Sequence, residues 1–151
     1  MILHILKPDA EDYEKLTDIC LRSKIHWGYP EYLIELCKDE LTITPRYIRK
    51  HNLLKVENEH REILGFGSIN SVSGNGLYEI AHFRILPEHM DKNIGKLLLE
   101  RLESRFGKKA TIQVVTDPNV MSFYQKFGYR KVGEVKSKPD GRSLPVLKKK
   151  L

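Results

Sequence analysis

Apolar residues recur at helical spacing in the first third of the chain and at strand spacing in much of the later sequence. A short apolar run predicts a first strand, and two amphipathic stretches that each begin at a proline predict helices. Gly28 separates the two helices, because glycine ends helices readily. These elements are, in order, a strand over 2–6, helices over 9–21 and 30–37, and a segment over 43–48 that fits a helix or an extended stretch equally well.

The remaining chain predicts six strands and two helices. Ser73-Gly74-Asn75-Gly76 is a strong hairpin signal, because glycine and asparagine tolerate the positive φ of such turns. The β-branched run Thr111–Val115 predicts a strand buried on both faces. A turn at Pro139-Asp140-Gly141 separates the last two strands. The predicted strands cover 53–57, 63–70, 77–86, 111–115, 130–136 and 143–149, and the helices cover 93–105 and 117–127.

The order of these elements predicts one mixed α/β domain over residues 1–151, a length that suits a single domain. With 40% apolar and 30% charged residues, the composition is that of a globular protein. Two cysteines, Cys20 and Cys37, are too few for a disulfide framework or a zinc set, which indicates a reducing cytoplasm. We expect no signal peptide and no membrane span, because the apolar stretch at the start is short and charged residues come directly after it.

The formal net charge of +6 and the pI of about 9.3 are compatible with a polyanionic partner. Much of the charge, however, lies near the end of the chain, where a solvated tail explains it as well. The chain lacks the interleaved aromatic and basic residues of a single-strand nucleic-acid surface. The sequence therefore argues against nucleic acid as the partner.

The strand over 77–86 leads through Pro87 and a polar loop into the helix that starts near Asn93. A helix N-terminus offers unpaired N–H groups and a positive dipole end, and a diphosphate fits such a site. Gly95 allows close approach of the backbone to a phosphate, and Lys92 and Lys96 add positive charge. Many such junctions bind nothing, so this pattern alone also allows a purely structural role.

Residues 85–98 resemble the cofactor-binding motif of GNAT acetyltransferases, Gln/Arg-x-x-Gly-x-Gly/Ala. Met90 occupies the Gln/Arg position, Asn93 the first Gly and Gly95 the second, so two of the three positions depart from the pattern. Asparagine is the mildest replacement for glycine at positive φ, and the family binds pyrophosphate mostly through main-chain amides. The cofactor-binding residues that the resemblance implies in this part of the chain are Phe83, Arg84, Ile85, Met90, Asp91, Lys92, Asn93, Ile94, Gly95 and Lys96.

Residues 117–129 resemble a second GNAT segment, Asn-x-x-x-(apolar)-Tyr-x-(Lys)-x-Gly-(Phe/Tyr). The resemblance implies that Asn119 and Phe123 contact the cofactor, Asn119 at the pantetheine arm. It also implies that the Tyr124 hydroxyl points at the thioester sulfur. From the residues alone, Tyr124 could equally be a core aromatic, because the helix carries several other apolar side chains. The tail 141–147 also resembles the last strand of small GNAT members.

The resemblance covers the chain in element order and implies the GNAT fold, a central mixed, mostly antiparallel sheet of about six to seven strands flanked by about four helices. It implies an acetyl-CoA-dependent N-acetyltransferase that transfers an acetyl group to a primary amine by direct attack in a ternary complex. The alternative is a catalytically weak or inactive GNAT-fold protein that binds acyl-CoA or has a regulatory role. Met90 and Asn93 support that alternative.

An amine attacks a thioester only when it is neutral, so a general base is expected. Glu79 is the first candidate, because histone-acetyltransferase members of the superfamily place a glutamate at this position. His82 is the rival, because an unperturbed histidine titrates near neutral pH. Either residue could instead be structural. A main-chain N–H near Phe83 to Ile85 would polarise the acetyl oxygen.

The acceptor stays open between a small amine, an amino acid and a protein amine. In the family the first two helices line the acceptor side, where this chain carries aromatic and acidic residues that suit a cationic amine or simply pack the helices. No metal-binding motif is present, so no metal is expected. A homodimer is compatible with the family, and the sequence neither requires nor excludes it. The residues on the expected acceptor side are His26, Trp27, Tyr29, Glu31, Tyr32 and Glu35.

Overall fold

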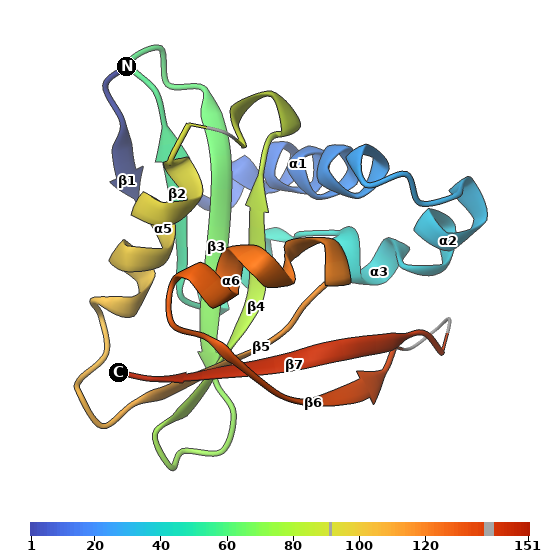
Figure 1. The fold of residues 1–151 in the computed structure, drawn as a ribbon. Coiled ribbons are helices and arrows are strands. Elements are labelled where there is room, and N and C mark those ends of the chain that lie inside the picture. The colour runs from blue at the N-terminus through green and yellow to red at the C-terminus, as the bar shows by residue number, and fades with distance from the viewer. Residues whose placement is uncertain (91, 138–140) are drawn as a thin grey trace. The chain divides into compact units, whose positions relative to one another are not determined.

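The seven predicted strands form one seven-stranded sheet in the computed structural model of the chain (Figure 1). The strand order is β1-β2-β3-β4-β5-β7-β6. Strand β4 pairs in parallel with β5, whereas the pairs β1–β2, β2–β3, β5–β7 and β6–β7 are antiparallel. The mixed, mostly antiparallel sheet is thus confirmed. The strands are β1 (His4–Leu6), β2 (Leu53–Glu57), β3 (Ile63–Ser71), β4 (Leu77–Ile85), β5 (Thr111–Val115), β6 (Arg130–Lys136) and β7 (Ser143–Lys150).

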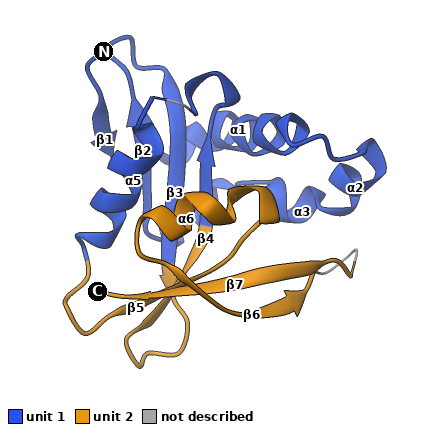
Figure 2. Cartoon of the chain, viewed as in Figure 1, with its two compact units in different colours: residues 1–69, 82–105 blue, residues 70–81, 106–151 orange. Residues whose placement is uncertain are grey.

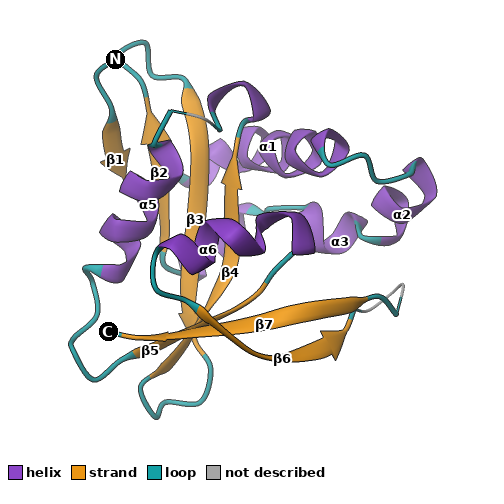
Figure 3. Cartoon of the chain, in the orientation of Figure 1, coloured by secondary structure: helices purple, strands orange, loops and turns teal. Residues whose placement is uncertain are grey.

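The structure describes residues 1–90, 92–137 and 141–151, and these contain six α-helices and three 3₁₀ turns, more than the four helices predicted (Figure 3). The extra helices are short pieces in the first third of the chain. Most of the ambiguous segment 43–48 is helical, because a helix begins at Pro45 and Thr44 caps it by accepting a hydrogen bond of 3.1 Å from the Tyr47 N–H. The helices are η1 (Ala10–Asp12), α1 (Tyr13–His26), α2 (Glu31–Leu36), α3 (Lys38–Leu41), α4 (Pro45–Lys50), η2 (Pro87–His89), α5 (Ile94–Glu103), η3 (Pro118–Val120) and α6 (Met121–Lys126).

The chain forms two compact units (Figure 2). The first unit comprises residues 1–69 and 82–105, and the second comprises residues 70–81 and 106–151. Strands β3 and β4 therefore contribute residues to both units.

The first unit places helices on both faces of its strands. Apolar side chains of α1 to α4 pack with β2 and β3 in one buried cluster, which includes the side chains of Cys20 and Cys37. On the opposite face lies α5, because a Cβ added to Gly67 of β3 would meet Leu102 Cδ1 at 2.8 Å. Members of the buried cluster include Leu16, Ile19, Cys20, Leu33, Cys37, Leu41, Ile43, Ile48, Leu53, Ile63, Phe66 and Leu86.

The second unit contains the hairpin that was predicted at residues 73–76. The Val72 N–H donates to the Leu77 carbonyl at 3.0 Å, and Gly74 and Gly76 both have positive φ, at 75° and 78°. The turn predicted at Pro139-Asp140-Gly141 falls largely on residues 138–140, which lie outside the described residues.

The prediction that Thr111–Val115 is buried on both faces is wrong. Only Ile112 and Val114 of β5 are fully buried, whereas the alternate residues are half-buried. Thr111 and Gln113 bring polar groups to the second face, so the run of β-branched residues covers a one-sided strand.

Candidate active site

Strand β4 ends at a proline, and this sets the path of the loop after it. Pro87 begins the 3₁₀ turn η2, because proline lacks an N–H and suits a first helical position. Just before it, the Leu86 N–H donates to the Leu64 carbonyl at 2.8 Å. On the other side, Glu88 forms an ion pair of 2.8 Å with Arg22 of α1. The exit of β4 is thus held to β3 and to α1 within the first unit.

Helix α5 begins at a left-handed residue. Asn93 is its N-cap, with φ 59° and ψ 13°, the conformation that asparagine and glycine adopt at least cost. The next three N–H groups, of Ile94, Gly95 and Lys96, belong to the first helical turn and lack acceptors within the helix. Together with the positive end of the helix dipole, these donors suit a phosphate group. The residues present therefore fit the pyrophosphate of coenzyme A.

Among the side chains near the start of α5, two lysines add positive charge and Met90 adds no polar group. Lys92 and Lys96 are exposed, and Lys92 Nζ lies 3.4 Å from His89 Nδ1. Met90 is half-buried and offers no charged or strongly hydrogen-bonding group. Asp91, also predicted to bind the cofactor, lies outside the described residues. Binding of an anion here depends on the main chain and on the two lysines.

Close packing of β3 against β4 holds the main chain of residues 83–85. A Cβ added to Gly65 would lie 2.6 Å from Ile85 Cδ1 and 2.7 Å from the Arg84 carbonyl oxygen. A Cβ added to Gly67 would lie 3.3 Å from Phe83 Cδ2. Phe83 therefore shares with Gly67 the face of the strands that α5 covers. A side chain at Gly65 would collide with the β4 main chain, whereas one at Gly67 would first meet the Leu102 side chain.

His82 and Arg84 occupy the other face of β4. The His82 ring lies 5.4 Å from the Tyr47 ring and 5.8 Å from the Phe66 ring, measured between centroids. Nearby, Tyr47 Oη lies 3.0 Å from Ser68 Oγ. His82 Nδ1 and Arg84 Nε are both buried without a hydrogen-bond partner. The face of β4 that looks toward α1 and α4 thus carries polar groups in a mostly apolar setting.

Burial lowers the pKa of His82 to about 4, and the positive charges of Arg84 and His51 act in the same direction. At neutral pH the imidazole is uncharged. Its low pKa makes it a weak proton acceptor. Arg84 also affects Cys20 of α1, although burial dominates and raises the pKa of that thiol.

In the second unit, Glu79 lies in the parallel part of the sheet. It stands opposite Gln113 in the β4–β5 ladder and is half-buried. A carboxylate in that position keeps access to water. Glu79 and His82 lie on opposite faces of β4, because they are an odd number of residues apart.

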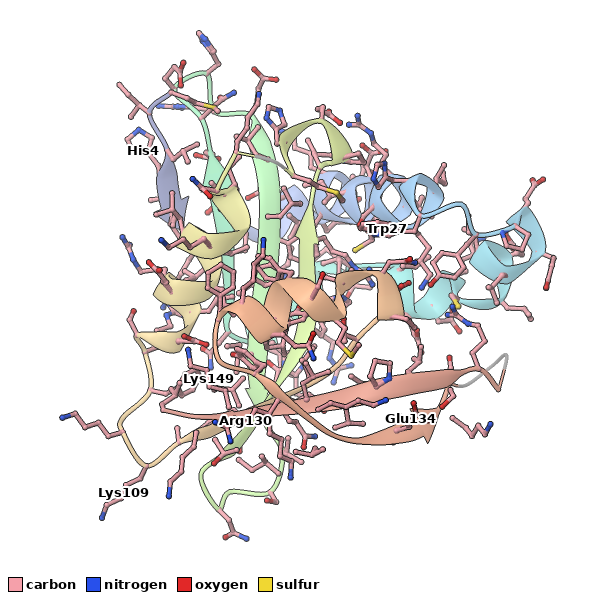
Figure 4. All side chains as sticks on the ribbon, viewed as in Figure 1. His4, Trp27, Lys109, Arg130, Glu134 and Lys149 are labelled. Atoms are coloured by element: carbon pink, nitrogen blue, oxygen red, sulfur yellow. The ribbon has the colours of Figure 1, made fainter. Side chains whose placement is uncertain are left out.

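The helix α6 and the turn before it carry the other predicted residues of the second unit. Asn119 is exposed, and both its N–H and its Nδ2 donate to Asp117 Oδ1 at 2.9 Å. Tyr124 is buried, with its ring centroid 5.3 Å from that of Phe123 and 5.5 Å from that of Tyr129. On β7, Lys149 places Nζ 5.6 Å from the centre of the Tyr129 ring (Figure 4 labels Lys149). Tyr124 is therefore held firmly by aromatic packing.

The expected acceptor side begins where α1 ends, in the first unit. Trp27 comes directly after that helix, and its ring meets the His26 ring edge-on at 4.9 Å (Figure 4). The Lys24 ammonium lies 4.5 Å from the centre of the Tyr29 ring. Tyr32 of α2 is 69% exposed, so this aromatic group is open to solvent.

The predicted residues fall into two sets. The first unit contains His82 to Ile85 together with the described loop residues from Met90 to Lys96, and the second contains Glu79, Asn119, Phe123 and Tyr124. Sequence reasoning missed the neighbours of His82, namely Tyr47 and Phe66, because no local pattern connects these residues to β4. For Arg84, the sequence predicted only a contact of its main chain with the cofactor and no role for its side chain.

Among the described residues, no group of three or more His, Cys, Asp or Glu side chains is arranged to hold a metal ion. In the same part of the chain, no helix has the length and apolar character needed to cross a membrane.

Solved structures share this fold. The PaiA N-acetyltransferase of Thermoplasma acidophilum, solved in complex with coenzyme A, is 21% identical and superposes with a TM-score of 0.80 over 100% of both chains. YjaB of Escherichia coli, solved in its apo form in solution, is 24% identical, with a TM-score of 0.69 over 98% of this chain and 96% of that chain. A GCN5-related N-acetyltransferase of Rhodopseudomonas palustris is 18% identical, with a TM-score of 0.74 over 99% of this chain and 95% of that chain.

The chain has no significant match among curated protein sequences. The family model of the GNAT acetyltransferase domain, in contrast, matches residues 35–147. This match covers most of the chain, including the loop before α5 and the segment around Tyr124. The chain therefore belongs to the GNAT family of acetyltransferases, whose cofactor is acetyl-CoA.

Proposed function

We propose that the protein transfers an acetyl group from acetyl-CoA to a primary amine by direct attack of the amine in a ternary complex. The observation that carries the proposal is the left-handed Asn93 at the start of α5, which takes the conformation that the family's glycine would take. The family match and the coenzyme A bound to the related PaiA enzyme support it. We treat residues 1–151 as one functional domain.

The main-chain N–H groups of Ile94, Gly95 and Lys96 would hold the pyrophosphate, with the side chains of Lys92 and Lys96 adding charge. Asn119 would contact the pantetheine arm, and Phe123 would contact the cofactor. Acetyl-CoA supplies the acetyl group as a thioester. A main-chain N–H of β4 between Phe83 and Ile85 would donate a hydrogen bond to the acetyl oxygen.

The acceptor amine must lose a proton before it attacks. A lysine-like amine has a pKa near 10.4, so keeping it neutral at pH 7 costs roughly 4–5 kcal/mol unless the protein relieves it. Glu79 is the proposed base, because it is a half-buried carboxylate with access to water. His82 is the second candidate, because burial and the positive charges of Arg84 and His51 oppose the uptake of a proton there.

Tyr124 is the proposed acid. Its hydroxyl would donate a proton, or at least a hydrogen bond, to the departing thiolate. The aromatic rings of Phe123 and Tyr129 hold the Tyr124 ring in place, so the hydroxyl needs little reorganisation.

Acetyl-CoA binding is the first test. Thermal unfolding is measured with and without acetyl-CoA, with ADP as the control ligand. A hundredfold excess of acetyl-CoA over its dissociation constant stabilises a binding protein by about 2.7 kcal/mol. A panel of amines is then screened for release of free coenzyme A thiol. No stabilisation at millimolar acetyl-CoA would contradict the proposal.

The second candidate is a GNAT protein that binds acyl-CoA without catalysis. The observation that favours it is Met90, an apolar residue where the family has Gln or Arg. Stabilisation by acetyl-CoA without thiol release for any amine would select this candidate. We propose a cytoplasmic location under either function, because the two cysteines Cys20 and Cys37 are too few for a disulfide framework.

A further inference from the structure

Arg84 is a cation without a carboxylate partner among the described residues. Its Nε is buried and donates no hydrogen bond, and none of the ion pairs in the described part of the chain includes Arg84. Removing a guanidinium from water is costly unless an anion or several acceptors compensate. This position on β4 therefore retains capacity for an anionic ligand.

His82 provides a second, independent observation on the same strand. Its Nδ1 is also buried without a partner. Alternate residues of a strand point to one face, so the His82 and Arg84 side chains share a face of β4. The charges that act on the His82 imidazole come from Arg84 and His51, and both are positive when protonated. Arg84 Nε and His82 Nδ1, which both lack a hydrogen-bond partner, thus lie in a region of positive electrostatic potential.

The surroundings keep this pair partly dry. The rings of Tyr47 and Phe66 flank His82, and the buried Cys20 thiol lies beside Arg84. Hydrogen bonds to an anion are stronger where water is excluded. The planar guanidinium also matches the geometry of a carboxylate.

We propose that Arg84 and His82 bind a carboxylate of the acceptor, so that the protein acetylates amines that also carry a carboxylate. The Arg84 Nε–H and the His82 Nδ1–H donate to the carboxylate oxygens, and no covalent bond changes at this subsite. Identifying the bound molecule as the acceptor rests on the proposed acetyl transfer. The existence of an anion site at Arg84 and His82 does not depend on acetyl transfer.

Matched acceptors test the substrate class. Thiol release is measured with amino acids and with the corresponding amino-acid amides, which keep the amine and lose the negative charge. Because the amine of an amide is less basic, the readout is the acid-to-amide ratio of kcat/KM compared between proteins. We expect Arg84→Met to lower that ratio about 10- to 100-fold, the worth of a hydrogen-bonded charge.

Two further variants sharpen this result. Arg84→Lys keeps the charge but loses the planar fork, and we expect an intermediate ratio. Arg101→Met removes one exposed positive charge from α5 and should leave the ratio unchanged. An unchanged ratio in both Arg84 variants would overturn the proposal and leave acetyl transfer intact.

A binding measurement separates the two proposals. N-acetylglycine carries a carboxylate beside an acetylated amine, and N-acetylglycine amide is its uncharged match. We expect N-acetylglycine, but not the amide, to stabilise the protein and to raise the NMR titration midpoint of His82. Absence of both effects up to the solubility limit of N-acetylglycine would refute the anion site. If N-acetylglycine stabilises the protein and acetyl-CoA does not, the proposed function is refuted and the anion site is retained.

Discussion

Lys55 and Asp12 form a nearly buried ion pair, with 2.8 Å between Lys55 Nζ and Asp12 Oδ2. The Lys55 side chain is only 7% exposed, and Glu57 Oε2 approaches the same ammonium at 2.7 Å. Burial by itself would lower the pKa of Lys55, but hydrogen bonds and charges from both carboxylates outweigh it and raise the pKa. The triad ties η1 to β2 within the first unit.

Lys55→Met should destabilise the protein by about 3–5 kcal/mol at pH 7, because it leaves two carboxylates close together without their cation. Urea denaturation gives the free energy of unfolding. The triple variant Lys55→Met, Asp12→Asn, Glu57→Gln should recover part of the loss. Since the folded pKa of Lys55 is raised, the wild-type contribution is present below the unfolded pKa and disappears as pH rises through the folded pKa. An equally stable Lys55→Met variant would contradict the expected role.

Asn93 variants test the left-handed start of α5. With φ at 59°, Asn93→Gly should keep or slightly raise stability, whereas Asn93→Ala should lose about 1 kcal/mol relative to the glycine variant. Acetyl-CoA stabilisation should show the same order, because the residue at position 93 positions the first-turn amides. Chemical denaturation and thermal unfolding measure the two effects. Equal stability of the alanine and glycine variants would exclude a conformational role.

Tyr124→Phe should lower turnover about 100-fold or more while leaving acetyl-CoA affinity nearly unchanged, because phenylalanine keeps the packing and removes the acid. Tyr129→Phe is the matched control, since Tyr129 is a buried tyrosine whose ring packs against Tyr124. Single-turnover kinetics and titration with acetyl-CoA provide the two readouts. Unchanged turnover in Tyr124→Phe would remove this hydroxyl from the mechanism.

Glu79→Gln should reduce kcat/KM about 100-fold at neutral pH, because a glutamine cannot accept the proton of the amine. If Glu79 is the base, His82→Gln should retain the acidic limb of the pH–rate profile, where kcat/KM rises as the base loses its proton. The pH dependence of kcat/KM for both variants decides between them. If the acidic limb disappears in His82→Gln and persists in Glu79→Gln, His82 and not Glu79 is the base.

His82 should make stability depend on pH in mildly acidic solution. Its folded pKa of about 4 lies below the usual 6.5, so the unfolded chain binds more protons between these values. Stability is therefore retained above pH 6.5 and lost as pH falls toward 4, by an amount on the order of 3 kcal/mol. His82→Gln should flatten this part of the curve, whereas the exposed His60→Gln should not. Urea denaturation across the pH range measures it.

Local patterns predicted the strands well. The bounds of β2, β5 and β6 agree with those expected from periodicity and turn residues. The first third of the chain was less predictable, because α2 and α3 are only one or two turns long. Helices that short depend on packing against neighbours rather than on propensity.

The candidate site divides in the same way. The left-handed conformation at Asn93 agrees with residue type, since asparagine and glycine share that preference. The neighbours of His82 had no local signal. Tyr47 is 35 positions away in the sequence, and only the packing of α4 against β3 and β4 brings its ring to His82.

The sequence by itself determined the order of strands and helices, the loop that enters α5 and the chemical groups available at each position. The tertiary structure alone decided which groups are buried together, and hence the low pKa of His82 and the buried, unsatisfied Nε of Arg84. Backbone preferences act over a few neighbouring residues, whereas desolvation and electrostatic fields depend on side chains that folding collects from distant parts of the chain.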